Sequence, residues 1–351
     1  MAFYASTLGG YVHGGITMNS GSTVRVRVIH GDALHTDADV LALKYARQFY
    51  GADERAADTL KQYEVKDMSP GVGSFRLLDT QGAVAAHRVL FVGVPQLYQF
   101  DYSEIRIFGS KVLAALAGEV PDARVIVMTL HGPGYGLDER ECFLSELAGL
   151  ADAVASGDYP SALSVIKIVE QNRGRAQRLS GLLEVFFPGG WIDSDLDAMQ
   201  ERIGSERSKT LRDVGYESSQ KSHVFVAMPF SDDMSDLFYY GIRQAVNANG
   251  YLCERIDLTP SVGDVLTQIK NKIKTSSFVV AELTGANPNV YLEVGYAWAC
   301  EVPTILLIKK EEISCLRFDV AGQRCIMYSS IRDLEERLSS ELSELKSRQL
   351  V

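Results

Sequence analysis

The sequence predicts an α/β protein of two domains, with a parallel sheet in the second domain. Short apolar runs rich in β-branched residues recur along the chain, and amphipathic stretches with helical spacing stand between them. Strands that alternate with helices of about a dozen residues favour a parallel sheet covered on both faces. The chain has 351 residues, which is enough for two domains of ordinary size.

The first domain is expected over residues 23–190. It follows a Gly-, Ser- and Thr-rich opening, residues 1–22, with neither a basic n-region nor a long apolar stretch, so we expect a flexible tail and no signal peptide. The pattern then predicts four strands, at Val24–Ile29, Ala38–Leu43, His87–Val94 and Arg124–Leu130. Helices are expected at Ile105–Ala117 and Cys142–Val154, the latter with an apolar stripe.

A connector is expected between the two domains. Pro188-Gly189-Gly190 ends a helix, and residues 191–220 are polar and charged with few apolar anchors. This composition predicts a linker with one short amphipathic helix. The second domain is expected over residues 221–335, and a C-terminal helix or tail over residues 336–351.

The second domain repeats a strand-then-helix pattern. Pro229 ends a strand at Val224–Ala227, and Ser231 or Asp232 can cap the helix that follows. A helix is expected at Gly263–Ser276, and later strands are expected at Tyr251–Ile256, Phe278–Ala281, Thr304–Ile308 and Cys325–Met327.

The stretch Ala281–Ala299, AELTGANPNVYLEVGYAWA, places Glu293 on a helix directly after a buried strand. Open α/β sheets keep their ligands at this edge. We expect Glu293 in the first turn of the helix, where free backbone amides help to keep a carboxylate ionised. Acidic residues are also favoured in the first turn of any helix, so a purely stabilising role is the alternative.

The series VFVAMPFSDD, AELTGANPNVYLEVGYAWA, PTILLI, RFDV and CIMY resembles the nucleoside 2-deoxyribosyltransferase-like domains, distant relatives of TIR domains. The resemblance covers residues 221–331 and implies a flavodoxin-like or TIR-like parallel sheet. It also implies cleavage or exchange of the N-glycosidic bond of a nucleoside, a nucleotide or NAD. In that family the glutamate of the E-x-G-Y-A motif reacts, and Glu293 occupies its position here. The family completes its pockets across a dimer, so a homo-oligomer is expected, with the region around Phe318, Asp319 and Tyr328 as one contact.

A carboxylate suits this chemistry because breaking a C1′–N bond builds positive charge on the sugar, which a carboxylate can attack or stabilise. The other substrate-binding candidates each have a structural alternative. Asp264 and Gln268, four residues apart, can hold ribose hydroxyls or simply form a solvated helix face. Asn287 and Asn289 can shape the sugar pocket or serve the turn, and Met228 and Phe230 can support a base or pack in the core.

The first loop of this domain lacks the glycine-rich or tyrosine-bearing form of the best-characterised transferases, and no dinucleotide or P-loop motif follows any strand. Hydrolysis of a nucleotide or dinucleotide therefore fits better than exchange of bases.

In the first domain, Gly31-Asp32 follows the first strand, and His131-Gly132-Pro133-Gly134-Tyr135-Gly136 joins a strand to a helix with a capping-box pattern at Asp138 and Glu141. Such a loop lets backbone amides approach a phosphate. The arrangement resembles a macro domain, the ADP-ribose-binding fold. That resemblance implies that Asp32 lies on the adenosine side and that Gly132, Gly134 and Gly136 surround the diphosphate. A plain tight connection is the alternative.

Composition excludes several classes of function. With 45 acidic and 35 basic residues the chain has no overall basic character for nucleic acid. The 5 cysteines include no C-x-x-C pair and no clustered metal pattern, so a reducing cytoplasm, no metal and no cofactor are expected. No apolar run approaches the roughly 20 residues of a membrane span.

Two functions remain. The first is an N-glycosidase acting on a nucleotide or NAD, controlled by a nucleotide-sensing first domain, as in bacterial antiviral defence effectors. The alternative is a protein without catalysis whose two domains bind nucleotide signals.

Overall fold

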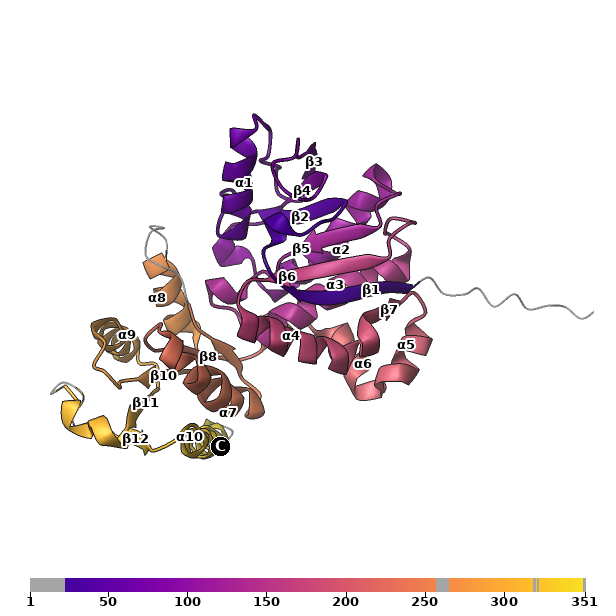
Figure 1. The fold of residues 1–351 in the computed structure, drawn as a ribbon. Helices are drawn as coiled ribbons and strands as arrows, with labels where there is room; N and C mark the ends of the chain where they lie inside the picture. Colours follow the sequence, from indigo (N-terminus) through magenta and orange to yellow (C-terminus); the bar gives the residue numbers. More distant parts are fainter. Residues whose placement is uncertain (1–22, 257–264, 318–319, 321, 350–351) are drawn as a thin grey trace, which may run out of the picture.

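The computed structural model describes residues 23–256, 265–317, 320 and 322–349, and these build two β-sheets with their covering helices (Figure 1). We call the first sheet and its helices, up to residue 220, the first unit, and the second sheet and its helices the second unit. The chain is α/β throughout, as predicted.

The first sheet is mixed. Its 7 strands lie in the order β3-β4-β2-β5-β6-β1-β7. The strands are β1 (Thr23–His30), β2 (Val40–Tyr45), β3 (Phe75–Asp79), β4 (Arg88–Gly93), β5 (Val125–Met128), β6 (Val165–Glu170) and β7 (Trp191–Asp193). β3 and β7 run antiparallel to their neighbours at the two edges, and the strands between them are parallel.

The helices of the first unit divide its core into two layers. They are α1 (Ala52–Gln62), α2 (Tyr102–Glu119), α3 (Glu139–Ser156), α4 (Arg173–Phe186), α5 (Leu196–Ile203) and α6 (Ser205–Asp213). Along β2, Val40 and Ala42 face the core shared with α2 and α3, whereas Leu41 and Leu43 face the core under α1. A strand buried on both faces reads as a continuous apolar run, which is what β2 shows.

Residues 191–220, expected as a polar linker, are packed onto the first unit. They form β7, α5 and α6, and Ile203, Leu211 and Val214 are buried in the same core cluster as α2 and α3. A few apolar residues on two short helices are therefore enough to seat this segment on the core.

The second sheet has 5 parallel strands in the order β12-β11-β10-β8-β9. They are β8 (His223–Ala227), β9 (Leu252–Glu254), β10 (Phe278–Glu282), β11 (Thr304–Lys309) and β12 (Cys325–Tyr328). In chain order this is the 2-1-3-4-5 arrangement of flavodoxin-like sheets, which confirms the predicted class. The strand order reverses between β8 and β10, so ligands are expected beyond the carboxyl ends of these strands.

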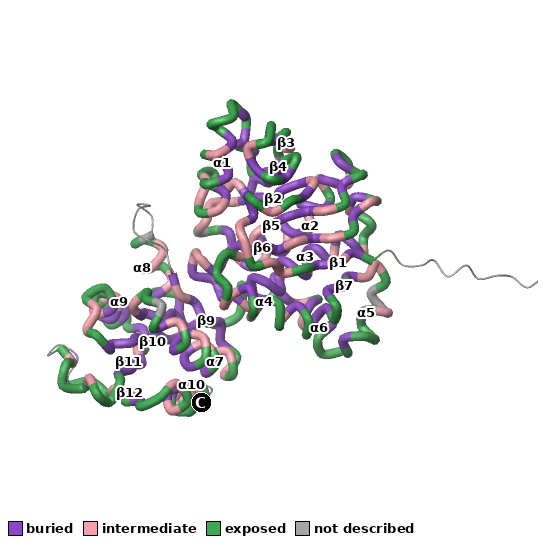
Figure 2. Tube along the Cα trace, in the orientation of Figure 1, coloured by how far each residue is buried: buried purple, intermediate pink, exposed green. Residues whose placement is uncertain are grey.

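Helices cover both faces of the second sheet, and Figure 2 shows buried residues concentrated along the strands of both sheets. A π-helical turn (Leu237–Ile242), α7 (Arg243–Ala248) and α10 (Ile331–Gln349) lie on one face, and α8 (Val265–Thr275) and α9 (Pro288–Ala299) lie on the other. Tyr328, expected near an oligomer contact, is buried with 1% exposure, so that part of the expectation is wrong. Phe318 and Asp319 lie outside the described residues.

The edge strand β9 faces the first unit. Asp138 accepts a hydrogen bond from the amide of Cys253 at 3.1 Å and from the side chain of Asn247 at 3.1 Å. Tyr102 donates to Glu254 at 2.8 Å, and Leu252 packs in the core of the first unit. An open strand edge needs such cover, and here the first unit supplies it.

Candidate functional site

A cavity of about 280 Å³ opens at the carboxyl ends of β1, β2, β5 and β6 in the first unit. Its walls come from the start of α1, the loop after β5 and the loop after β6. The lining residues are Ala33, Lys44, Tyr50, Gly51, Ala52, Asp53, Arg55, Thr129, Leu130, His131, Gly132, Gly134, Tyr135, Val169, Glu170, Gln171 and Arg175. Parallel sheets hold their ligands at this edge, so the cavity is a candidate ligand site.

The predicted glycine loop forms one wall. Gly132 has φ +106° and a Cβ there would lie 2.5 Å from Cys142 Sγ, so only glycine fits. A Cβ on Gly134 would meet nothing within 4 Å, so this residue borders open space. The amides of Gly132 and Gly134 donate no hydrogen bond to any described residue. Gly136, also predicted, does not line the cavity and packs against Ile256 of the second unit.

Asp138 caps α3 as predicted, and its side chain accepts a hydrogen bond from the amide of Glu141 at 3.1 Å. The second half of the capping box is absent, because Glu141 accepts hydrogen bonds from Ser218 and Lys221, while Tyr102 accepts the hydrogen bond from the Asp138 amide.

Asp32 does not line the cavity itself, but it is hydrogen-bonded to two residues that do. Its carboxylate accepts hydrogen bonds from the Leu34 amide at 3.0 Å, from Arg55 at 3.1 Å and from Gln171 at 3.1 Å. Arg55 and Gln171 both line the cavity. Partial burial opposes ionisation, but the Leu34 amide and the Arg55 guanidinium hold the pKa of Asp32 below its usual range.

A chain of four buried ionisable side chains runs inward from the cavity, and sequence reasoning missed it. Lys44 of β2 pairs with Asp53 of α1. Asp53 Oδ1 lies 3.6 Å from His131 Nε2, and His131 Nδ1 lies 3.8 Å from Oε2 of Glu146 in α3. All four side chains are at most 4% exposed.

The contacts within this cluster shift the pKa values of Lys44, Asp53 and His131 towards their charged forms. Burial opposes ionisation of Lys44 and of Asp53, but their attraction raises the pKa of Lys44 and lowers the pKa of Asp53. Burial likewise disfavours the imidazolium, yet the neighbouring side chains of Asp53 and Glu146 raise the pKa of His131. Placed between the side chains of Asp53 and Glu146, His131 holds a proton on both ring nitrogens more readily than a free histidine does.

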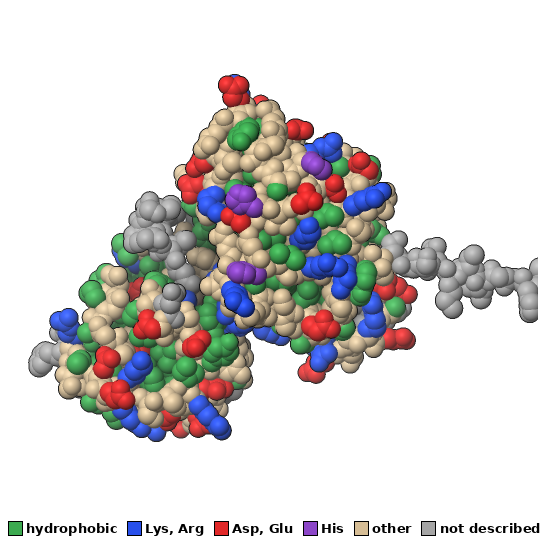
Figure 3. Space-filling model, in the orientation of Figure 1, with side chains coloured by type: hydrophobic (Ala, Val, Ile, Leu, Met, Phe, Trp, Pro, Cys, Tyr) green, Lys and Arg blue, Asp and Glu red, His purple; other side chains and the backbone are tan. Residues whose placement is uncertain are grey.

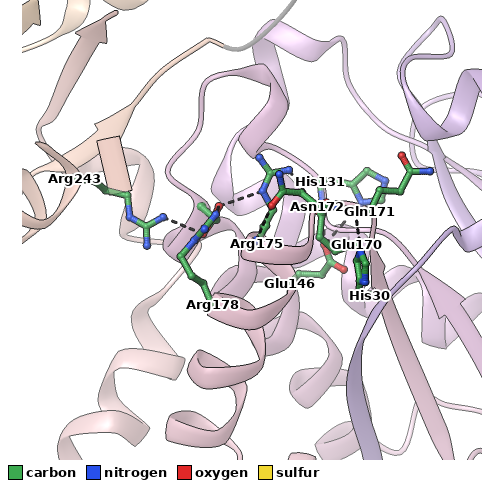
Figure 4. Close-up of polar contacts among 10 residues, drawn as sticks. His30, His131, Glu146, Glu170, Gln171, Asn172, Arg175, Arg178 and Arg243 are labelled. Atoms are coloured by element: carbon green, nitrogen blue, oxygen red, sulfur yellow. Dashed lines mark hydrogen bonds and ion pairs between the residues drawn. The ribbon is translucent and has the colours of Figure 1, made fainter. Parts of the chain in front are cut away.

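Arg175 joins the cavity to a second cluster of charges. It lines the cavity and donates to Glu139 at 3.1 Å and to Glu170 at 3.4 Å. Arg178 and Arg243 also donate to Glu139, each at 2.9 Å, so three guanidinium groups share one carboxylate (Figure 4). These contacts lower the pKa of Glu139 to about 2 despite its burial.

In the second unit, Glu293 lies on α9 after β10, but not in the first turn. α9 begins at Pro288, so Glu293 falls in the second turn, beyond reach of the free amides. The expectation that these amides keep it ionised is therefore wrong. No described residue forms a hydrogen bond or ion pair with it, and burial raises its pKa to about 7.

The other predicted residues of the second unit lie on three different segments. Met228 is buried in the core at the end of β8, whereas Phe230 is 58% exposed with the Arg255 guanidinium 5.4 Å from its ring. Asn287 caps α9 by accepting from the amide of Asn289, whose side chain is exposed. Gln268 is half-buried on α8, and Asp264 lies outside the described residues.

Three further findings bear on the site. No group of three or more His, Cys, Asp or Glu side chains in the described residues is arranged to hold a metal ion. None of the described helices combines the length and the apolar composition needed to cross a bilayer. Basic and acidic side chains occur side by side on both units on the face in Figure 3.

Among solved structures, this chain is similar to macrodomains. No protein-family model matches it, and no curated protein does. A Trypanosoma brucei macrodomain in complex with ADP is 13% identical with a TM-score of 0.38, covering 45% of this chain and 69% of its own. An Oceanobacillus iheyensis macrodomain with ADP is 10% identical with a TM-score of 0.37, covering 47% and 96%. The macro domain of ganglioside induced differentiation associated protein 2 is 14% identical with a TM-score of 0.34, covering 47% and 85%.

Proposed function

We propose that the cavity of the first unit binds a nucleotide diphosphate of the ADP-ribose type. The observation that carries this proposal is the pair of amides at Gly132 and Gly134, which line the cavity at the carboxyl edge of the sheet and donate no hydrogen bond to a described residue. Gly134 also borders open space. Backbone amides in glycine-rich loops are strong donors to phosphate oxygens, and glycine lets the phosphate come close.

The charges around the loop favour the same class of ligand. Arg55 and Arg175 line the cavity on the side of the loop after β6 and the start of α1, and guanidinium groups bind phosphates through paired hydrogen bonds. Asp32, hydrogen-bonded to the lining residues Arg55 and Gln171, is the acceptor that an adenosine hydroxyl or amino group would use. ADP and ADP-ribose, the ligands named for the T. brucei macrodomain structures, belong to this chemical class.

Replacing Gly134 by valine tests the proposal. Its φ is not positive and its Cβ would enter open space, so the Gly134→Val side chain occupies the ligand's place without straining the loop. Calorimetry on the full chain with ADP-ribose and ADP should show binding to the wild type and at least a tenfold loss of affinity in the variant.

Gly181→Val on α4 is the matched control, since Gly181 also has open space and no positive φ. It should bind like the wild type. Equal affinity of Gly134→Val and wild type would remove the glycine loop from the binding site.

The second unit supports a second candidate function, N-glycosidic cleavage of a nucleotide or NAD at Glu293. The observation that favours it is a half-buried carboxylate after the central strand β10 whose pKa burial raises to about 7. Buried carboxyl groups with raised pKa values are frequent at catalytic sites. A sugar that becomes cationic beside Glu293 would favour the carboxylate form and be stabilised by it.

The roles of the other predicted residues follow from this candidate. Phe230, exposed on the loop after β8, is available to stack with a base, whereas Met228 supports that loop from the core. Gln268 and Asn289 would hold sugar hydroxyls, and Asn287 acts through the cap that fixes the start of α9. If the second unit has no such activity, the chain is a nucleotide-binding protein.

Glu293→Gln should abolish release of free base from NAD and from a panel of nucleotides and deoxynucleotides, measured by chromatography, because the amide keeps the shape and loses the charge. In the wild type the rate should fall as the pH drops below about 7, since the carboxylate becomes protonated. Glu301→Gln, an exposed substitution just after the same helix, should keep full activity. Undiminished turnover by Glu293→Gln would end this candidate function.

A further inference from the structure

Arg175 takes part in two sites at once. It lines the nucleotide cavity, and it also lines a small cleft of about 20 Å³ between the units, together with Glu139, Tyr239 and Arg243. The first unit's ligand site and the contact with the second unit therefore share one guanidinium.

Glu139 is the acceptor through which that guanidinium reaches the second unit. Its Oε1 accepts from Arg178 and from Arg243 of α7, and its Oε2 accepts from Arg175 and Arg178. Glu139 is only 6% exposed, so water does little to replace a lost partner. Figure 4 shows Arg243 approaching from the second unit and Arg175 and Arg178 from α4.

The same segment contacts the second unit on either side of Glu139. Asp138 accepts from the Cys253 amide of β9, and a Cβ on Gly136 would lie 2.6 Å from Ile256 Cγ1. The loop that would hold the phosphates therefore continues directly into the surface that holds the second unit.

We infer that an anionic ligand in the cavity is sensed through Arg175, and that its capture of this guanidinium strengthens the Glu139–Arg243 contact with the second unit. The inference rests on the proposed nucleotide-binding function. When a phosphate draws Arg175 from Glu139 Oε2, the carboxylate keeps Arg178 and Arg243 as its partners. The negative charge of Glu139 is then divided between two guanidinium groups instead of three, so its hydrogen bonds with Arg178 and Arg243 become stronger.

Thermodynamic reciprocity gives the direction of the effect. If the ligand tightens the Glu139–Arg243 contact, then that contact must tighten ligand binding by the same factor. Without Arg243, Glu139 binds Arg175 more strongly, and a ligand needs more free energy to draw Arg175 away from Glu139. Removing Arg243, which does not line the cavity, should therefore weaken binding.

Calorimetry on the full chain with ADP-ribose tests this. Arg243→Gln should raise the Kd about fivefold or more, a factor at the lower end of the range for allosteric coupling. Arg243→Lys, which keeps the charge, should restore most of the affinity. Arg324→Gln, which removes an equal charge from an ion pair with Glu341 in the second unit, should leave the Kd unchanged.

Amide hydrogen exchange of the wild type gives a readout that needs no variant. ADP-ribose should slow exchange in α7 and β9 as well as in the glycine loop, and Arg243→Gln should abolish the slowing in α7 and β9. Protection confined to the first unit, or an unchanged Kd in Arg243→Gln, would overturn the inference and leave nucleotide binding intact. No binding by the wild type would overturn both.

Discussion

The buried cluster of Lys44, Asp53, His131 and Glu146 joins several elements of the first unit. Removing one member of a buried ion pair leaves an uncompensated buried charge, at a typical cost of about 3–5 kcal/mol. Here the cluster links β2, α1, the glycine loop and α3, so it fixes the base of the cavity. The two ring nitrogens of His131 face the carboxyl groups of Asp53 and Glu146. The cluster therefore fixes the position of the glycine loop that carries His131.

The raised pKa of the buried His131 makes the stability of the fold depend on pH. Because its folded pKa is raised, its contribution is complete below the usual histidine value of about 6.5 and is lost as the pH rises through the folded pKa. The melting temperature of the wild type should therefore fall between pH 6 and pH 9 more steeply than that of His131→Gln.

His87→Gln is the control for this measurement, because the His87 side chain is 78% exposed. Its carboxylate neighbour, Asp39, lies 3.9 Å away and is itself partly exposed. Its melting curve should follow the wild type across the same pH range. Parallel slopes for the wild type and His131→Gln would mean that His131 is neutral in the folded protein.

Single residues were the least predictable part of the site. Asp32 and the glycines follow strands and belong to turn motifs, and the resemblance to a macro domain implied their roles. Lys44 carried a signal too, as a charge inside the apolar run VLALKY. The partners of Lys44 were hidden because Asp53 and Glu146 lie on helices whose burial depends on tertiary packing. In the sequence Arg175 resembles an arginine on the surface of a helix, because its contact with Glu139 forms only in the folded protein.

At the scale of elements, α10 is the clearest case of a helix held by its apolar face. Leu334, Leu338 and Leu342 recur every four residues and are 0% exposed against the sheet and α7. Leu338→Ala should lower the free energy of unfolding by about 2–5 kcal/mol, measured by urea denaturation.

Leu292→Ala on α9 is the comparison, because that side chain is 66% exposed. It should change the free energy of unfolding by less than about 0.5 kcal/mol. Equal effects of the two substitutions would mean that α10 is not part of the cooperative core.

The elements that the sequence revealed are those with a strong internal pattern. All five strands of the second sheet were predicted, and four lie close to their observed bounds because each is an apolar run between turn residues. The fifth, β9, spans only Leu252–Glu254 of the six residues predicted. β3, β6, β7 and α1 were missed. β7 has three residues and exists only because β1 offers it an antiparallel edge, and β6 contains a charged Lys167 whose Nζ donates to the Asp37 carbonyl.

At the scale of the whole molecule, the sequence indicated two sheets but not how tightly the units join. Residues 191–220 looked like a solvated connector because most of them are polar. The fold needs only Ile203, Leu211 and Val214 to attach that segment to the core. Contacts between units bring together residues more than a hundred positions apart, such as Asp138 and Cys253, and local periodicity carries no trace of them.

The position of Leu252 has a consequence for how such a protein can be taken apart or recombined. This residue belongs to the second sheet by its backbone and to the first unit's core by its side chain. A fragment that stops before residue 220 would lose this apolar contact, the hydrogen bond from Tyr102 to Glu254, and the hydrogen bonds that Asp138 accepts from Asn247 and Cys253. A design that moves the cavity of the first unit to another protein must therefore include the edge strand β9, because the two units share these contacts.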